Sequence, residues 1–163
     1  MKKFPDMDRL DLLIEKSADS DPDIAKAFFA FRLASQKALG KIEGFFTKYN
    51  LRHSQVSIML VLYANENRPE TSVNISNKLG LSSATISNVV HTLEKKGFIE
   101  RNKQESDKRF YSIILSEDGI KFLDDFIPDY QLHYMRLFSN FTEEEIKTMK
   151  ELSLKLFHNL DTF

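Results

Sequence analysis

Residues 71–115 read TSVNISNKLGLSSATISNVVHTLEKKGFIERNKQESDKRFYSIIL, and this stretch decides the fold. It divides into two short helices joined by a tight turn, followed by a hairpin. Ser72, which follows a threonine, is expected to cap the first helix, and Gly80 to end it, because glycine tolerates the left-handed backbone of a helix C-terminus. Ser82 is expected to cap the second helix, which should stop at Gly97.

The second helix has two faces of different character. Ile86, Val89, Val90 and Leu93 repeat at helical spacing and are expected to face a core. The other face is small, polar and nearly uncharged, as a helix that presses against base edges in a DNA major groove needs to be. An ordinary serine- and threonine-rich surface is the alternative interpretation. The residues of this face are Ser83, Ala84, Thr85, Ser87, Asn88, His91 and Thr92.

The hairpin supplies positive charge. One strand is expected to begin at residues 98–100, and residues 110–115 are expected to form the return strand. Between them lie four basic residues that can meet phosphates or enter a minor groove, where negative potential concentrates. Two helices, a turn and a charged hairpin in this order predict a winged helix-turn-helix. The four basic residues are Arg101, Lys103, Lys108 and Arg109.

Several short motifs at matching spacing carry a resemblance to a known family. They are Leu51 and Gln55, LGLS at 79–82, LEKKGFIER at 93–101, DKR at 107–109 and LSEDG at 115–119. With these motifs the chain resembles the multiple-antibiotic-resistance regulator (MarR) family of bacterial transcription factors, roughly from residue 25 to residue 160. In that family an Asp-x-Arg pair marks the wing. The resemblance implies that Arg109 enters the minor groove and that Asp107 helps to hold it.

The resemblance also implies how the protein works. Family members are dimers in which the first and last helices of two subunits interleave, and each dimer binds a palindromic operator on double-stranded DNA. Family effectors are often small aromatic acids or lipophilic compounds that bind between the dimerisation helices and the DNA-binding lobe. We therefore expect a homodimeric, ligand-responsive repressor, whose effector-binding residues the sequence does not identify.

Composition narrows the class of protein. The chain has 163 residues, of which 42% are hydrophobic and 29% are charged, so a packed core is expected. It has no cysteine, which excludes disulfides and thiolate metal sites. No apolar run is long enough to span a membrane, and the charged N-terminus lacks the apolar segment of a secretory signal. We expect a cytoplasmic protein that does not insert into membranes.

Charge is distributed unevenly although the net charge is −1. Residues 71–110 hold seven Lys and Arg against four Asp and Glu, a balance of +3. Residues 116–163 hold five against ten, a balance of −5. The expected DNA-binding part is therefore the positive part, and two subunits would double its field.

The flanking segments are expected to be helical. A short helix is expected at residues 7–17, with a loosely docked N-terminal arm as the alternative. A long helix is expected from Pro22, capped by Asp21, to about residue 50. Its wide apolar stripe should be buried partly by its own domain and partly by a second subunit. A further helix is expected at residues 52–65.

Two more helices are expected after the hairpin. The first begins at Ser116 and should be kinked by Pro128, which lacks a backbone donor. The second begins with a capping box of Thr142 and Glu145 and carries an apolar line to the terminus. The chain is thus expected to be mainly α with a small β-hairpin wing, with dimerisation helices at 1–50 and 116–163 and a DNA-binding lobe at 51–115.

The recognition helix differs from many family members at one position, where Asn88 replaces arginine. Because asparagine pairs with adenine and arginine with guanine, an A·T preference is expected there. His91 lies one turn further and could reach a phosphate or a base, or act as a solvent-facing spacer. The full predicted set of DNA contacts is Ser82, Ser83, Ala84, Thr85, Ser87, Asn88, His91, Arg101, Lys103, Asp107, Lys108 and Arg109.

No catalytic constellation, cofactor motif or metal site is predicted, so we do not expect an enzyme. The five glycines do not form a phosphate-binding loop, and the four histidines do not form a metal-ligating pair. Two alternatives are kept. One is a winged-helix adaptor that binds protein rather than DNA, and the other is a small-molecule enzyme with a helical fold.

Overall fold

The computed structural model describes residues 21–103, 111–160 and 162. The helix expected at 7–17 lies outside these residues. The chain forms two compact units, Met1–Lys41 and Ile42–Phe163, and the long helix α2 (Pro22–Thr47) begins in the first and ends in the second. No helix within the described ranges is long and apolar enough to cross a membrane.

The described part of the first unit is the N-terminal portion of α2. The Asp21 carboxylate accepts the backbone N–H of Asp23 at 2.9 Å, so the expected cap is present. The apolar residues of this portion are largely exposed: Phe28 is 57% and Phe31 is 50% accessible. The N-terminal part of the wide stripe predicted from the sequence is thus largely exposed within the described chain, whereas Phe45 and Phe46 at its C-terminal end are buried.

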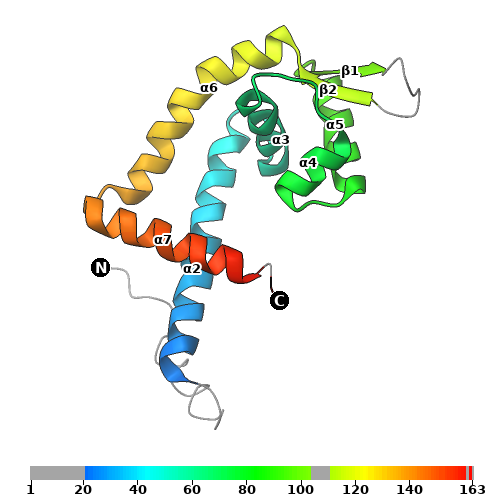
Figure 1. The fold of residues 1–163 in the computed structure, drawn as a ribbon. Coiled ribbons are helices and arrows are strands. Elements are labelled where there is room, and N and C mark those ends of the chain that lie inside the picture. Colours follow the sequence, from blue (N-terminus) through cyan, green and yellow to red (C-terminus); the bar gives the residue numbers. More distant parts are fainter. Residues whose placement is uncertain (1–20, 104–110, 161, 163) are drawn as a thin grey trace. The chain divides into compact units, whose positions relative to one another are not determined.

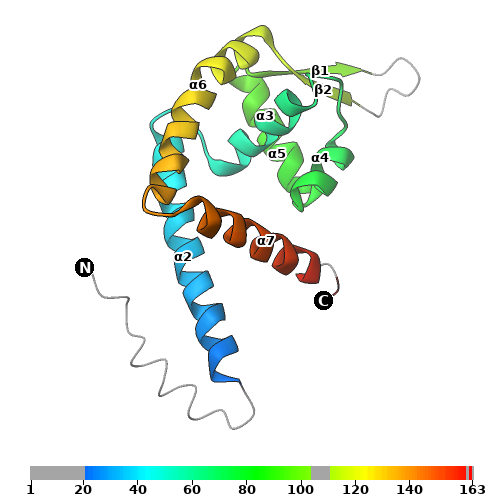
Figure 2. The same ribbon diagram turned by 60° about the vertical axis from the view of Figure 1, so that its left-hand side comes forward.

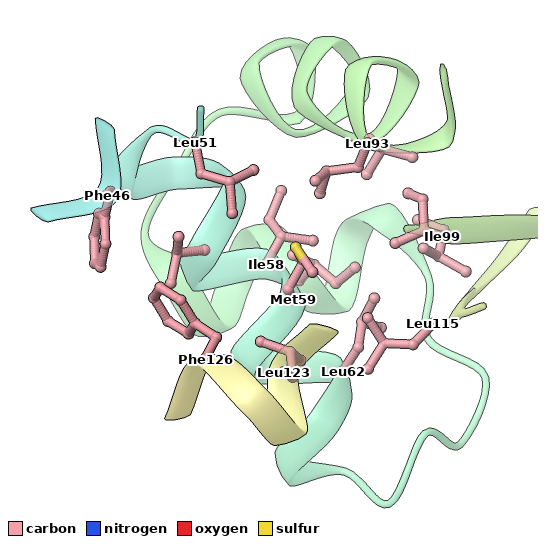
Figure 3. Close-up of a cluster of buried hydrophobic side chains, with 14 of the residues drawn as sticks. Phe46, Leu51, Ile58, Met59, Leu62, Leu93, Ile99, Leu115, Leu123 and Phe126 are labelled. Atoms are coloured by element: carbon pink, nitrogen blue, oxygen red, sulfur yellow. The ribbon is translucent and has the colours of Figure 1, made fainter. Parts of the chain in front are cut away.

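The core of the second unit is built from side chains of four helices, of the C-terminal end of α2 and of a hairpin. Figures 1 and 2 show the course of these elements. Helices α3 (His53–Ala64), α4 (Ser72–Leu79) and α5 (Ser83–Lys95) contact one another, and α3 also contacts the later helix α6 (Glu117–Met135). Strands β1 (Ile99–Lys103) and β2 (Tyr111–Leu115) pair antiparallel, with Ile99 opposite Leu115. Figure 3 shows side chains from these elements meeting in one cluster, including Ile58, Met59, Leu62, Leu93, Ile99, Leu115 and Leu123.

The helix boundaries follow local side-chain chemistry. Helix α4 is capped by Thr71 rather than by Ser72, since the Thr71 hydroxyl accepts the Asn74 N–H at 3.2 Å and Ser72 is already helical. Gly80 ends α4 with φ at 63°, as expected from its lack of a side chain. Ser82 caps α5 by accepting the Thr85 N–H at 3.2 Å, which confirms the predicted start.

The family motif at Gln55 has a local structural reason. Its side-chain oxygen accepts the Arg52 N–H at 2.9 Å, which satisfies a free donor at the start of α3. Gln55 is only 6% exposed, so its buried side-chain oxygen would lack a partner without this hydrogen bond.

A third segment extends the two-stranded sheet. Glu70 forms an antiparallel bridge with Ile113, in which each backbone N–H donates to the other carbonyl, at 3.0 and 2.7 Å. Asn67, in left-handed backbone with φ at 53°, uses its side-chain amide in the same way against Leu115. It donates to the Leu115 carbonyl at 3.0 Å and accepts the Leu115 N–H at 2.6 Å. The segment before α4 is therefore fixed to β2.

The junction between β2 and α6 is tight. The Ser116 N–H donates to the Phe98 carbonyl at 3.1 Å, and the Ser116 hydroxyl caps α6 by accepting the Gly119 N–H at 3.0 Å. A Cβ atom on Gly119 would lie 2.1 Å from that same Phe98 carbonyl oxygen. Gly119 is thus required by the close approach of two backbone segments, which explains the LSEDG motif physically.

Helix α6 joins an aromatic cluster at the C-terminal end of α2. The Phe126 ring lies 5.7 Å from Phe45, 6.0 Å from Phe46 and 5.0 Å from Tyr49. Phe126 is 1% exposed. Helical spacing in the sequence instead predicts a buried line that does not include it and consists of Ile120, Leu123, Ile127, Tyr130, Tyr134 and Leu137. Pro128 lies inside α6, and the helix continues past it to Met135.

After the short 3₁₀ helix η1 (Arg136–Phe138), the last helix α7 (Glu143–Leu160) begins at the predicted capping box. The Thr142 hydroxyl accepts the Glu145 N–H at 3.2 Å, and the Glu145 carboxylate accepts the Thr142 N–H at 2.8 Å. No residue of α7 is buried within the described chain. Its apolar row is exposed and consists of Ile146, Met149, Leu152, Leu156, Phe157 and Leu160.

Candidate nucleic-acid interface

The outward face of α5 is arranged as the helical spacing predicts. The inward face consists of Ile86, Val90 and Leu93, which are 0%, 1% and 0% exposed. The opposite face of the helix therefore points away from the core. That face presents the predicted contact residues to solvent on one surface. The exposed residues are Ser82, Ser83, Ala84, Thr85, Ser87, Asn88 and His91.

Only part of this face is held by hydrogen bonds within the chain. The Ser82 and Thr85 hydroxyls lie 2.8 Å apart and bond each other, so both are partly used in the cap. The Asn88 side-chain amide has no hydrogen-bond partner within the described ranges, and it is free to bind both the donor and the acceptor of one base edge. His91 Nδ1 lies 4.0 Å from Glu94 Oε2, at the limit of an ion pair.

The basic residues of the hairpin have different surroundings. Arg101, predicted as a DNA contact, has its Nε 3.2 Å from the Glu94 carboxylate of α5, and its side chain is 24% exposed. The reason is that β1 packs against α5, so the Arg101 side chain lies along that helix. Lys103 ends β1. Asp107, Lys108 and Arg109 lie outside the described residues, as does the rest of the hairpin tip.

A pocket of about 280 Å³ lies where α4, α5 and the hairpin meet. Its lining joins Ser72 and Val73 from the start of α4 with Ser87 from α5 and with Arg101 and Tyr111 from the two strands. Of these, only Ser87 and Arg101 belong to the predicted contact set. The others could not be found from sequence, because no periodicity shows that the first turn of α4 lies beside the hairpin.

A buried carboxylate positions α4 beside this pocket. Glu70 is 5% exposed and forms an ion pair with Lys78. Its oxygens also accept the side-chain amides of Asn65 and Asn74, each at 3.1 Å. The hydrogen bond from Lys78 holds the pKa of the Glu70 carboxyl below its ordinary value, and burial opposes this shift. The role of Glu70 was not predicted from the sequence. Its partners Asn65, Asn74 and Lys78 lie up to eight residues away, and no sequence motif links them to it.

No group of three or more histidine, aspartate or glutamate side chains among the described residues is arranged to hold a metal ion. The residues that this region brings together are hydrogen-bonding groups and cations on an exposed helix face and a hairpin. Such groups can bind a polyanion by hydrogen bonds and charge.

Comparison with known proteins agrees with this arrangement. The model of the MarR family matches residues 51–110. The transcriptional regulator MhqR of Bacillus subtilis is 30% identical over 118 residues, which cover 69% of this chain and 80% of that protein. The transcriptional repressor YetL of the same organism is 23% identical over 163 residues, which cover all of this chain and 98% of that protein.

Solved structures show the same fold. A complex of MepR from S. aureus with DNA superposes with a TM-score of 0.73 at 27% identity, covering 80% of this chain and 96% of MepR. A MarR/EmrR family regulator from Acinetobacter sp. ADP1 has a TM-score of 0.73 at 26% identity, covering 88% of this chain and all of that one. The chain therefore belongs to the MarR family of winged-helix transcriptional regulators.

Proposed function

We propose that this protein is a transcriptional repressor that binds a specific double-stranded DNA operator. The exposed, uncharged and hydrogen-bonding face of α5 carries the proposal, because a purely solvated helix would place Glu and Lys there. The complex of MepR with DNA, whose fold this chain shares, supports DNA binding by this chain. Nothing in the described residues favours the adaptor or the enzyme.

Each subunit is proposed to place residues 82–92 in a major groove and Arg109 in the flanking minor groove. Lys103 and Lys108 would contact phosphates, and Asp107 would hold Arg109. Base contacts would come from Asn88, with His91 reaching a base or phosphate one turn further along the helix.

We propose that a homodimer forms this repressor in the cytoplasm, with segments 1–50 and 116–163 making the dimer and 51–115 binding DNA. The exposed apolar row on α7 supports this, since a row of that length on a soluble protein is usually covered. Two-fold symmetry then requires a palindromic operator. Its regulation is proposed to depend on a small aromatic or lipophilic effector, to which no residue of this chain is assigned.

Selection of preferred sequences from a random pool of duplex DNA tests the proposal. We expect a palindrome whose half-sites are about 10 base pairs apart, with adenine at the position that Asn88 contacts. Binding should weaken steeply with added salt, because bound cations on DNA are released. A pool without enrichment would favour the adaptor, and guanine at the Asn88 position would contradict the base assignment.

Replacing Arg109 with alanine tests the wing. The loss of one minor-groove cation should weaken operator binding by about 1–3 kcal/mol, measured by fluorescence anisotropy on the selected operator. Sedimentation should show an unchanged dimer. Lys121 on α6 is exposed and is not one of the proposed DNA contacts, so its replacement by methionine is the control for loss of one positive charge. Equal affinity of the Arg109 variant and the wild type would exclude the wing assignment.

A further inference from the structure

Helix α6 has a weak point in its backbone at Pro128. The helix follows β2 and leads through η1 to α7, so it joins the proposed DNA-binding lobe to the C-terminal segment that is proposed to take part in the dimer. Pro128 lies inside it. Because proline has no N–H, the carbonyl of Asp124, four residues earlier, lacks its helical donor, and the helix bends most easily at this place.

The two halves of α6 are packed differently. Before Pro128, the side chains of Leu123 and Phe126 are buried, so this half is fixed on the core. After Pro128, no residue of α6 is buried within the described chain. This half is held partly by aromatic contacts, such as that between the rings of Tyr130 and Phe46, whose centres lie 5.2 Å apart. Its position therefore depends more strongly on contacts near the surface.

One hydrogen bond ties each half of α6 to another part of the chain. Before Pro128, the Tyr63 hydroxyl of α3 donates to Asp124 Oδ1 at 2.6 Å. After it, the Tyr49 hydroxyl, from the turn that follows α2, donates to Asp129 Oδ2 at 2.9 Å. Five residues correspond to about 140° around a helix axis, so the two aspartates lie at opposite borders of the buried face. The two bonds thus oppose both bending and rotation of α6.

Both tyrosines keep the proton that these bonds require. The hydrogen bond to Asp124 raises the pKa of the Tyr63 phenol above its ordinary value. Burial, and then the hydrogen bond to Asp129, raises the pKa of the Tyr49 phenol. Each phenol therefore stays a donor at neutral pH, and a donor to a carboxylate forms a stronger bond than a donor to a neutral group.

We propose that Pro128 is a hinge and that Tyr49 and Tyr63 are positioning residues, which determine how strictly the protein selects the spacing of its two DNA half-sites. The proposal rests on the proposed function and deepens it. A dimer contacts both half-sites at once only when its two lobes match their separation and rotation. A hinge that is held in place makes a mismatch costly, whereas a released hinge lets each lobe turn toward a shifted half-site. The two hydroxyls act through α6 and contact no DNA.

The test compares binding of the full-length protein to the selected operator and to the same operator with one base pair inserted between the half-sites. The insertion turns one half-site by about 36° relative to the other, because a turn of DNA holds about 10 base pairs. The measured quantity is the ratio of the two dissociation constants, determined by fluorescence anisotropy. For Tyr49→Phe this ratio should fall roughly three- to tenfold below that of the wild type, the scale of one charge-assisted hydrogen bond near solvent.

Tyr63→Phe should lower the ratio less than Tyr49→Phe does. Its bond holds the half of α6 that the core already fixes through Leu123 and Phe126. A larger effect of Tyr63→Phe would contradict the assignment of the second half as the part that moves.

Variants of the acceptor separate the hydrogen bond from the ring. Asp129→Ala should lower the ratio as far as Tyr49→Phe does, whereas Asp129→Asn keeps an oxygen acceptor and should retain most of the wild-type ratio. Tyr134→Phe is the matched control, because Tyr134 lies on the same half of α6 and its hydroxyl has no hydrogen-bond partner among the described residues. It should keep the wild-type ratio, and a fall as large as that of Tyr49→Phe would overturn the proposal.

Replacement of the proline tests the hinge itself. Pro128→Ala restores the donor to the Asp124 carbonyl, so the helix should resist bending without help from the tyrosine. In this background Tyr49→Phe should change the ratio by less than twofold, on the order of the smallest surface contributions. An equal effect of Tyr49→Phe with and without Pro128 would exclude the hinge.

A merely structural role of Tyr49 would weaken binding to both operators alike and leave the ratio unchanged, which would overturn the proposal. A Tyr49→Phe protein that is monomeric in sedimentation would overturn it too, because the hydroxyl would then serve dimer formation. If melting shows that Tyr49→Phe is unfolded, Asp129→Ala and Asp129→Asn decide. A wild type that selects no sequence defeats the proposed function as well, whereas selection of one spacing by the wild type and Tyr49→Phe alike defeats this inference alone.

Discussion

A Gly119→Ala protein is expected to lose at least about 3 kcal/mol of stability, at the upper end of what overpacking costs. The added Cβ would lie 2.1 Å from the Phe98 carbonyl oxygen, a distance that no rotamer change can relieve, because both groups are backbone. The Phe98 carbonyl cannot simply move, since it accepts the Ser116 N–H that starts the turn into α6. Circular dichroism during thermal unfolding measures the effect.

Gly44 provides the matched control for this substitution. It lies in α2, and a Cβ there would have no atom of another described segment within 4 Å. Gly44→Ala should therefore be neutral or stabilise the helix by about 0.5–1 kcal/mol. If Gly119→Ala melted at the temperature of Gly44→Ala, the close approach of Phe98 and α6 would be wrong.

A Phe126→Ala protein is expected to lose about 3–5 kcal/mol, because it leaves a cavity among packed aromatic rings. The ring contacts Phe45, Phe46 and Tyr49 from the end of α2, and it is 1% exposed. For a chain of this size the melting temperature should fall by roughly 6–20 °C. Chemical denaturation, followed by circular dichroism, measures the change in the free energy of unfolding.

Phe141→Ala is the control for loss of an aromatic side chain. Phe141 is 45% exposed and contacts the ring of Phe138, so its removal creates no buried cavity. Its effect should stay within about 1 kcal/mol. Equal losses for the two variants would show that Phe126 is not at the centre of a packed cluster.

The sequence was sufficient to predict the recognition helix because one strong signal determines it. Ser82 caps, Gly97 follows the end, and the apolar residues Ile86, Val90 and Leu93 leave a single face for the polar ones. A helix with a single apolar face packs that face against the core, so the periodicity of its apolar residues predicts which of its other residues are exposed. The same reasoning correctly predicted the capping box of α7.

Helix α6 was harder because it carries two overlapping apolar lines. Ile120, Leu123 and Ile127 repeat at helical spacing, but so do Phe122 and Phe126. Leu123 of the first line and Phe126 of the second are both buried. The burial of Phe126 depends on the aromatic residues at the end of α2, and no local pattern contains that information. The sequence therefore predicted the helix and its start at Ser116 but missed the residue at the centre of its packing.

The candidate site was predictable only where its residues lie on one element. The exposed face of α5 follows from spacing, whereas the pocket requires the start of α4, the recognition helix and the hairpin to converge. Arg101 and Glu94 are seven residues apart and lie on different elements. A count of charges in the sequence cannot show whether two such residues form an ion pair or are each solvated. The partners of Glu70 likewise follow from tertiary packing alone.

The bridge between Glu70 and Ile113 also has a consequence for solubility. A hairpin of two strands exposes unpaired N–H and C=O groups along both of its borders, and such borders can template the addition of strands from other molecules. Here the backbone of Glu70 and the amide of Asn67 occupy the groups of Ile113 and Leu115 on the β2 border. At this border, the wing is protected from growing into an intermolecular sheet at high protein concentration.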